Sequence, residues 1–159
     1  MGVVFIDTSV LLNILKVPDK AQNVEAVKAQ LTSYHQNGST LLLPITAVIE
    51  TGNHIAQIKG HKYEKKTCAQ KFSDMLGAVS TGDAPWAPNE LTWNSTFITR
   101  IISGVNTGQR LEHLLEAGRF GAGDLAILAE AQEYKDRSRI SKVEIWTLED
   151  EMYSFKDIS

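Results

Sequence analysis

The sequence predicts an α/β fold, a three-layer α/β/α domain in which helix outweighs strand and the central sheet is mostly parallel. Short unbroken apolar runs such as Val3–Ile6 suit strands that are buried on both faces, as in parallel sheets. Between these runs, apolar residues recur at helical spacing, so strands and helices alternate. The 159 residues, 43% of them hydrophobic, suffice for one compact core. We therefore expect a single domain over residues 1–159.

The first half of the chain contains two strand-to-helix units. Val3–Ile6 ends at Asp7, and a helical pattern follows at residues 10–15. A second helical pattern comes after Pro18 and closes at Asn37-Gly38. The next strand is expected at Leu41–Leu43, where Pro44 ends it, and a helix is expected from about Thr46.

The second half is expected to be mainly helical. Apolar spacing indicates helices at about residues 63–79, 97–102 and 111–115, and Cys68 lies on an apolar stripe typical of a core position. The segment 86–93 contains Pro88 and directly follows Pro85, so it allows at most one short strand. A glycine-marked loop at 118–123 leads into an Ala-rich helix from Asp124, and residues 143–148 indicate a late strand.

Charge and cysteine content limit the class of protein. A net charge of −3 argues against a wholesale basic coat for duplex DNA. A single cysteine cannot form an internal disulfide, and the chain opens on Val3–Ile6 rather than on a cationic leader, so a cytoplasmic protein is expected. The apolar runs fall short of the roughly 18 residues that a membrane helix needs, so no membrane association is expected.

Acidic residues follow the predicted strands. Asp7 follows the first strand, Glu50 lies one turn into the helix after the second, and Asp124 opens the helix after the glycine loop. Glu149 and Asp150 follow the last strand. Ligands bind at the carboxyl ends of parallel strands, so these acids are expected to meet at one edge of the sheet. Each also has a structural interpretation, as a helix N-cap or as a solvated charge.

Clustered carboxylates favour a metal site. Like charges about 4 Å apart repel by on the order of 4 kcal/mol at an effective dielectric near 20, so a divalent cation is the natural compensation. Mg²⁺ and Mn²⁺ prefer oxygen ligands and often share them with substrate phosphates. One or two such ions can activate a water and neutralise a leaving oxygen, as in phosphodiester hydrolysis.

The same segments resemble PIN-domain ribonucleases, most closely the VapC-type toxins of toxin–antitoxin pairs. The similarity is carried by Val3–Asn13, Leu43–Glu50, Gly123–Ala129 and Ile145–Asp150, which together span most of the chain. It implies an endoribonuclease that uses Mg²⁺ or Mn²⁺, acts as the toxin of a pair with a cognate antitoxin, and forms a homodimer. The resemblance implies catalytic roles for Asp7, Glu50, Asp124 and Glu149 or Asp150. Asp7, Asp124 and Glu149 would be the metal ligands, with Thr8 and Thr147 in support.

The chain departs from the family pattern in three places. The region at about residues 83–118 is longer and more polar than in a minimal toxin of the family, and we call it the polar insert. The Thr-x-Asp signature reads Thr147-Leu148-Glu149, so either Glu149 or the neighbouring Asp150 must fill the fourth acidic position. Little room remains after Phe155 for the family's usual final strand.

Basic residues provide candidate RNA contacts. Residues 59–71 contain five lysines and one glutamate, a local charge of +4, and include Lys62, Lys65 and Lys66. These lysines could bind a phosphate backbone, with Tyr63 available to stack on a base. The alternative is that they form a solvated helix face. Arg119, in the loop before Asp124, is placed either to bind a phosphate or to stabilise the loop.

Two other functions remain open. A non-catalytic RNA- or protein-binding module of the same fold would need no metal, and the insert would serve a protein partner. A response-regulator-like phosphoacceptor would also place acids at strand ends, but the chain offers no lysine at a late strand end. Metal titration separates the first alternative from the nuclease.

Overall fold

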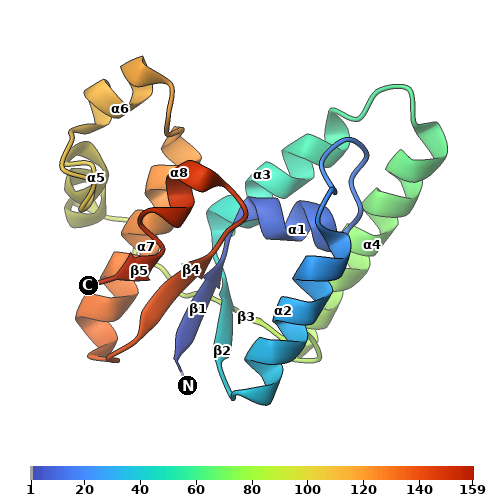
Figure 1. Ribbon diagram of the computed structural model, residues 1–159, viewed down its shortest axis with the longest axis horizontal. Coiled ribbons are helices and arrows are strands. Elements are labelled where there is room, and N and C mark those ends of the chain that lie inside the picture. Colours follow the sequence, from blue (N-terminus) through green and yellow to red (C-terminus); the bar gives the residue numbers. More distant parts are fainter. Residues whose placement is uncertain (1) are drawn as a thin grey trace.

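The computed structural model describes residues 2–159 and contains a central five-stranded sheet in the order β3-β2-β1-β4-β5 (Figure 1). The strands are β1 (Val3–Ile6), β2 (Thr40–Leu43), β3 (Ala87–Pro88), β4 (Val143–Trp146) and β5 (Asp157–Ile158). All neighbouring pairs are parallel except β4 with β5. The prediction of a helix-rich α/β domain with a mostly parallel sheet is confirmed.

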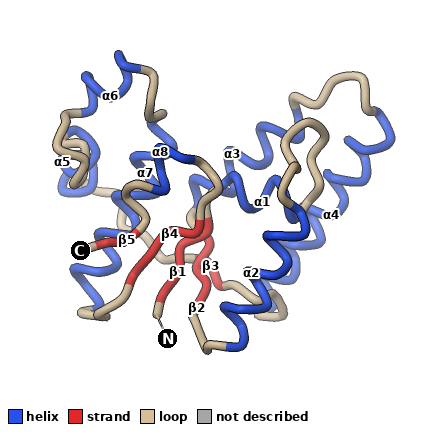
Figure 2. Tube along the Cα trace, in the orientation of Figure 1, coloured by secondary structure: helices blue, strands red, loops and turns tan. Residues whose placement is uncertain are grey.

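Eight helices surround the sheet in the described part of the chain (Figure 2). Their bounds are α1 (Thr8–Ile14), α2 (Val24–Gln36), α3 (Ile45–Ala56), α4 (Lys62–Thr81), α5 (Ser95–Ile102), α6 (Leu111–Ala117), α7 (Ala122–Ser138) and α8 (Asp150–Tyr153).

Ring contacts show that helices cover both faces of the sheet. Phe5 of β1 packs against Tyr134 of α7 with ring centroids 5.5 Å apart. Trp146 of β4 packs against Tyr34 of α2 at 5.3 Å. Trp146 pairs with Ile6, the strand neighbour of Phe5, so the two aromatic contacts lie on opposite faces. The sheet is therefore the middle layer of a three-layer arrangement.

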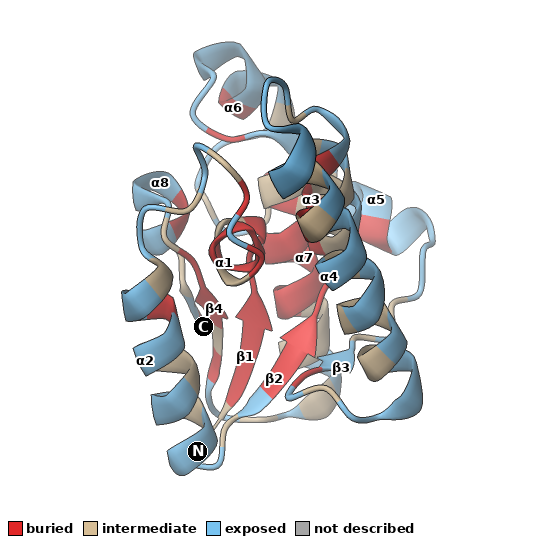
Figure 3. Cartoon of the chain, turned by 90° about the vertical axis from the view of Figure 1, so that its right-hand side faces the viewer, coloured by how far each residue is buried: buried red, intermediate tan, exposed pale blue. Residues whose placement is uncertain are grey.

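Strand β1 lies in the centre of the sheet, and all four of its residues are buried (Figure 3). This explains why its sequence is continuously apolar rather than alternating. A second, smaller core lies at the end of α1 and contains Leu15, Val17, Ile55 and Cys68. The Cys68 thiol donates a hydrogen bond of 3.3 Å to the carbonyl of Leu15, which confirms the predicted core position.

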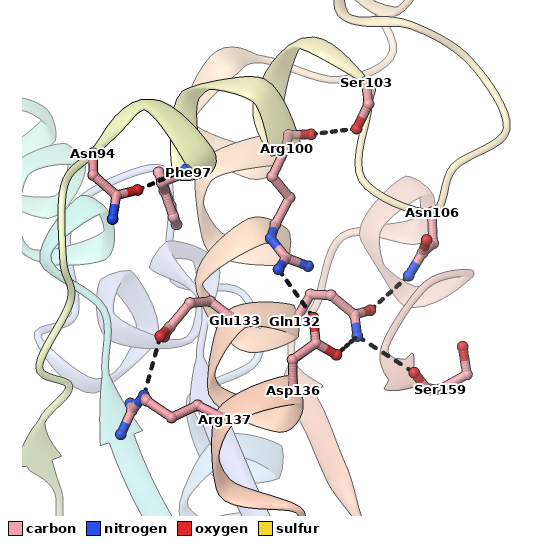
Figure 4. Close-up of polar contacts among 10 residues, drawn as sticks. All are labelled: Asn94, Phe97, Arg100, Ser103, Asn106, Gln132, Glu133, Asp136, Arg137 and Ser159. Atoms are coloured by element: carbon pink, nitrogen blue, oxygen red, sulfur yellow. Dashed lines mark hydrogen bonds and ion pairs between the residues drawn. The ribbon is translucent and has the colours of Figure 1, made fainter.

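The polar insert predicted at about residues 83–118 contains β3, α5 and α6, and α5 packs on α7. Figure 4 shows the polar contacts that hold it there. Arg100 forms an ion pair of 2.9 Å with Asp136, and the Asn106 side chain donates a 2.6 Å hydrogen bond to Gln132. Gln132 also donates to Asp136 at 3.0 Å. The insert is thus attached to the C-terminal half of α7.

Some boundaries differ from the predictions. The late strand ends at Trp146, not at residue 148, and α7 begins at Ala122. The short space after Phe155 holds only a two-residue strand, β5, which pairs antiparallel with β4. Among residues 2–159, no helix combines the length and apolar character required to cross a membrane.

Candidate carboxylate site at the edge of the sheet

Four of the predicted acidic residues lie at the edge where the parallel strands end. Asp7 directly follows β1, and Glu149 comes three residues after the end of β4. Glu50 is in α3, which begins two residues after β2, and Asp124 is in the first turn of α7. The parallel register of β1 with β2 and β4 brings their carboxyl ends together.

Asp7 is buried, with 1% of its surface exposed, and its carboxylate does not cap α1. Oδ2 instead accepts hydrogen bonds from Ser9 Oγ at 2.7 Å and from Thr147 Oγ1 at 2.8 Å. Oδ1 accepts no hydrogen bond from the described residues. Asp7 thus occupies the predicted N-cap position of α1 without capping the helix through its side chain, and one carboxylate oxygen is held while the other is left without a donor among the described residues.

Glu50 is positioned by contacts from two other elements. Its Oε1 accepts a 2.7 Å hydrogen bond from the hydroxyl of Thr8, at the start of α1. On the side of α7, the carboxylate lies against Gly123, where a β-carbon would come within 2.6 Å of Glu50 Cδ. The absence of a side chain at Gly123 lets α3 and α7 bring their acids together.

Asp124 has a structural role as well as a place in this cluster. Its Oδ2 accepts a 3.1 Å hydrogen bond from the backbone N–H of Gly121, which is the N-cap of α7, so Asp124 completes a capping box from the third helical position and is not itself the N-cap that the sequence predicted. Burial raises the pKa of Asp124, the Gly121 hydrogen bond opposes this effect, and the charges of Asp7 and Glu50 raise the pKa further. Capping uses one oxygen, and the carboxylate still interacts with the other acids.

Glu149 rather than Asp150 belongs to the cluster. Its backbone N–H donates a 3.1 Å hydrogen bond to Thr147 Oγ1, the same hydroxyl that holds Asp7. Desolvation raises the pKa of Glu149 to about 7, with further contributions from the charges of Asp7, Asp124 and Glu50. Both side chains are exposed, but Asp150 lies in the first turn of α8 and is not among the charges that act on Glu149 or Asp124.

The basic candidates lie outside the cluster. Arg119 is exposed and forms an ion pair of 3.1 Å with Glu151 in α8, which corresponds to its predicted structural role. Lys62, Lys65 and Lys66 lie in the first turns of α4. Lys65 donates a 2.8 Å hydrogen bond to the carbonyl of Ala56, so this segment meets the C-terminal end of α3.

Sequence reasoning missed Ser9 and Gly123 as site residues. Ser9 Oγ accepts a 3.0 Å hydrogen bond from the backbone N–H of Leu148 while it donates to Asp7, and so ties α1 to the segment after β4. Its position two residues after the strand-ending acid was the available signal, because short hydroxyl side chains commonly bond to neighbouring groups at helix starts. Nothing in the sequence alone indicates that Gly123 faces Glu50.

The cluster is not neutralised by the protein. Within residues 2–159, Asp7, Glu50, Asp124 and Glu149 form no ion pair with a lysine, arginine or histidine. Among the described residues, their hydrogen-bond donors are hydroxyls and one backbone N–H group. In the same residues, no group of three or more His, Cys, Asp or Glu side chains is close enough to hold a metal ion unaided.

The chain was compared with protein-family models, curated proteins and solved structures, and no match was found in any of the three comparisons.

Proposed function

We propose that this protein is a PIN-like, Mg²⁺- or Mn²⁺-dependent endoribonuclease. The observation that carries the proposal is the convergence of Asp7, Glu50, Asp124 and Glu149 from four separate segments without a cationic partner. Uncompensated carboxylates that raise one another's pKa values are typical of functional sites rather than of structural ion pairs. The resemblance of the surrounding motifs to PIN-domain ribonucleases supports the same conclusion.

The donor chemistry suits a hard cation. The side-chain donors of the cluster are oxygens, and Mg²⁺ is usually held by one or two carboxylates together with waters and phosphate oxygens. Asp7 through its free Oδ1, Asp124 and Glu149 would hold the ion, and a bound ion would activate water and stabilise the leaving oxygen.

Hydroxyl groups orient two acids of the site, Asp7 and Glu50. Thr147 and Ser9 fix Asp7 Oδ2, which leaves Oδ1 without a hydrogen-bond donor among the described residues. Thr8 holds Glu50 in place beside Gly123. Each acid thereby keeps one orientation without losing its negative charge, as preorganised electrostatic catalysis requires.

The test is cleavage of single-stranded RNA by matched variants in Mg²⁺ or Mn²⁺. Asp7→Asn and Glu149→Gln are expected to lose about 100-fold or more of the activity, because each removes a ligand charge from the site. Asp150→Asn, an exposed neighbour outside the cluster, is the control and should cleave like the wild type. Activity that is indifferent to a chelator or to Asp7→Asn would exclude the mechanism.

A non-catalytic binding module of the same fold is the second candidate. It is favoured by the finding that, in residues 2–159, no three acids are arranged to hold an ion unaided. Calorimetric titration with Mn²⁺ separates the two functions, because the module predicts no binding above that of Asp7→Asn.

A role as the toxin of a toxin–antitoxin pair requires a protein partner, and we propose a cognate antitoxin and a homodimer in the cytoplasm. Exposed apolar side chains support such a partner, among them Ile45 and Ile49 on α3 and Ile98 and Ile102 on α5. Light scattering at tens of micromolar should report a dimer. A monomer under these conditions would contradict this part of the proposal.

A further inference from the structure

A polar hollow lies at the C-terminal end of α3, outside the carboxylate cluster. It has a volume of about 320 Å³ and is formed by the loop between α1 and α2, the end of α3 and the segment that leads into α4. Its charged and imidazole side chains are Asp19, Lys20, His54, Lys59 and His61. We call it the basic hollow. Figure 2 shows the α1–α2 loop beside these helices.

The floor and rim of the basic hollow are firmly held. Val17 at its base is buried in the smaller core together with Ile55. The loop is fixed by hydrogen bonds of 3.0 Å from Val17 N–H to the Leu12 carbonyl and from Lys20 N–H to the Val17 carbonyl. Asp19 adopts a left-handed backbone with a φ of 66°, which turns the chain at the rim. The hollow is therefore a feature of the folded chain.

The side chains that line the basic hollow have a positive net charge, and its lysines are not paired with acids in the described part of the chain. Within residues 2–159, neither Lys20 nor Lys59 forms an ion pair. The one acid of the lining, Asp19, faces the ring of His61 at 3.9 Å. Two lysines against one aspartate leave a charge of +1 with both imidazoles neutral. Imidazole and amide N–H groups at this site add neutral donors for an anion.

The basic hollow is adjacent to the proposed active site along α3. Residues four apart on a helix lie on the same side, about one turn from each other. His54, in the lining, follows Glu50 by four residues, so both face the same side of α3. An RNA strand that ran past Glu50 along this helix would next reach the lysines of the basic hollow.

We infer that the basic hollow binds a backbone phosphate of the RNA strand, beside the phosphodiester held at the carboxylate cluster. The inference rests on the proposed nuclease function. It assigns Lys20 and Lys59 to substrate binding, and it extends the lysine-rich segment at residues 59–71 into a site with a defined shape.

The experiment measures binding without cleavage. A fluorescein-labelled single-stranded oligoribonucleotide is titrated by anisotropy in EDTA, over a range of salt concentrations, with wild type and with Lys20→Gln/Lys59→Gln. One lost phosphate contact lowers the slope of log K against log salt by about 0.7, which is about fivefold in affinity at 0.1 M salt. The control is Arg139→Gln/Lys142→Gln, two exposed bases between α7 and β4, at the opposite end of the sheet.

A lower affinity and a smaller slope in the hollow variant, with the control unchanged, would support the inference. The inference would be overturned if both variants lost RNA affinity equally, or if neither lost any. It would also be overturned if the wild type bound no RNA. Cleavage by Asp7→Asn and wild type in Mn²⁺ is scored separately. If wild type cleaves while the hollow variant binds normally, the inference alone fails. If nothing cleaves but the hollow variant binds more weakly, phosphate binding stands and the nuclease proposal fails.

Discussion

The acidic residues at the two ends of α7 differ in their partners: those at one end are paired with arginines, and the acid at the other end is not. In the C-terminal half, Asp136 pairs with Arg100 at 2.9 Å and Glu133 pairs with Arg137 at 3.0 Å. In the first turn, Asp124 interacts with Asp7 and Glu50 and has only a backbone N–H as donor. The paired acids hold α5 and neighbouring turns in place, as Figure 4 shows. The unpaired acids do not attach any element by charge.

This difference indicates which acids are structural. A carboxylate that only stabilises the fold is expected to have a cation or several donors, because burial of an unpaired charge is costly. At the edge of the sheet, burial and the charges of the neighbouring acids raise the pKa of Asp124 and of Glu149, which works against stability. Such a cost is expected where a ligand supplies the missing charge.

Glu130 lies between the two ends of α7 and gives the largest expected effect. It is fully buried, Asn89 donates a 2.8 Å hydrogen bond to its Oε1, and Oε2 has no partner. Burial raises the pKa of Glu130 from 4.5 to about 7, with Glu133 adding to the increase and the N–H groups of Asn89 and Ile45 opposing it.

Because the pKa of Glu130 is higher in the folded state, its contribution to stability is complete below pH 4.5 and is lost as pH rises through about 7. Between pH 5 and 8.5, wild type should therefore lose about 2 to 3 kcal/mol relative to Glu130→Gln. Urea unfolding of both proteins across this range measures the difference. Glu25→Gln, on the exposed side of α2, is the control, and parallel curves for Glu130→Gln would contradict the prediction.

The sequence allowed most of the fold and four acids of the site to be predicted, for a physical reason. A strand buried on both faces must be continuously apolar, so Val3–Ile6 indicated both its structure and the position of Asp7. The choice between Glu149 and Asp150 depends on how the chain turns after Trp146, and the hydrogen bond to the buried Glu130 comes from Asn89, which is distant in the sequence. These features arise from tertiary contacts, which no local pattern encodes.

Gly123→Ala gives the next effect, and it separates activity from stability. The new β-carbon would displace the Glu50 carboxylate and disturb its 2.7 Å hydrogen bond with Thr8. RNA cleavage is expected to fall about tenfold or more, since misplacing a catalytic group by about 1 Å costs up to 100-fold. Stability should hold or rise, because alanine is favoured over glycine in a helix by up to about 1 kcal/mol.

Gly77→Ala in α4 is the matched control, because a β-carbon there meets nothing within 4 Å. This variant should gain similar stability and cleave RNA like the wild type. Equal activity of Gly123→Ala and Gly77→Ala would show that the close approach of α3 and α7 does not matter to the site.

The smallest effect is expected at the other end of α7, where the charges are paired. A double-mutant cycle of Arg100→Gln and Asp136→Asn should give a coupling energy of about 0.5 to 1 kcal/mol in urea unfolding, since the pair is partly exposed. Cleavage should be the same in all four proteins, because these residues attach α5 and do not contact the carboxylate cluster. A loss of cleavage would show that the insert acts on the site through α7. The conclusion that the paired acids of this helix are only structural would then be wrong.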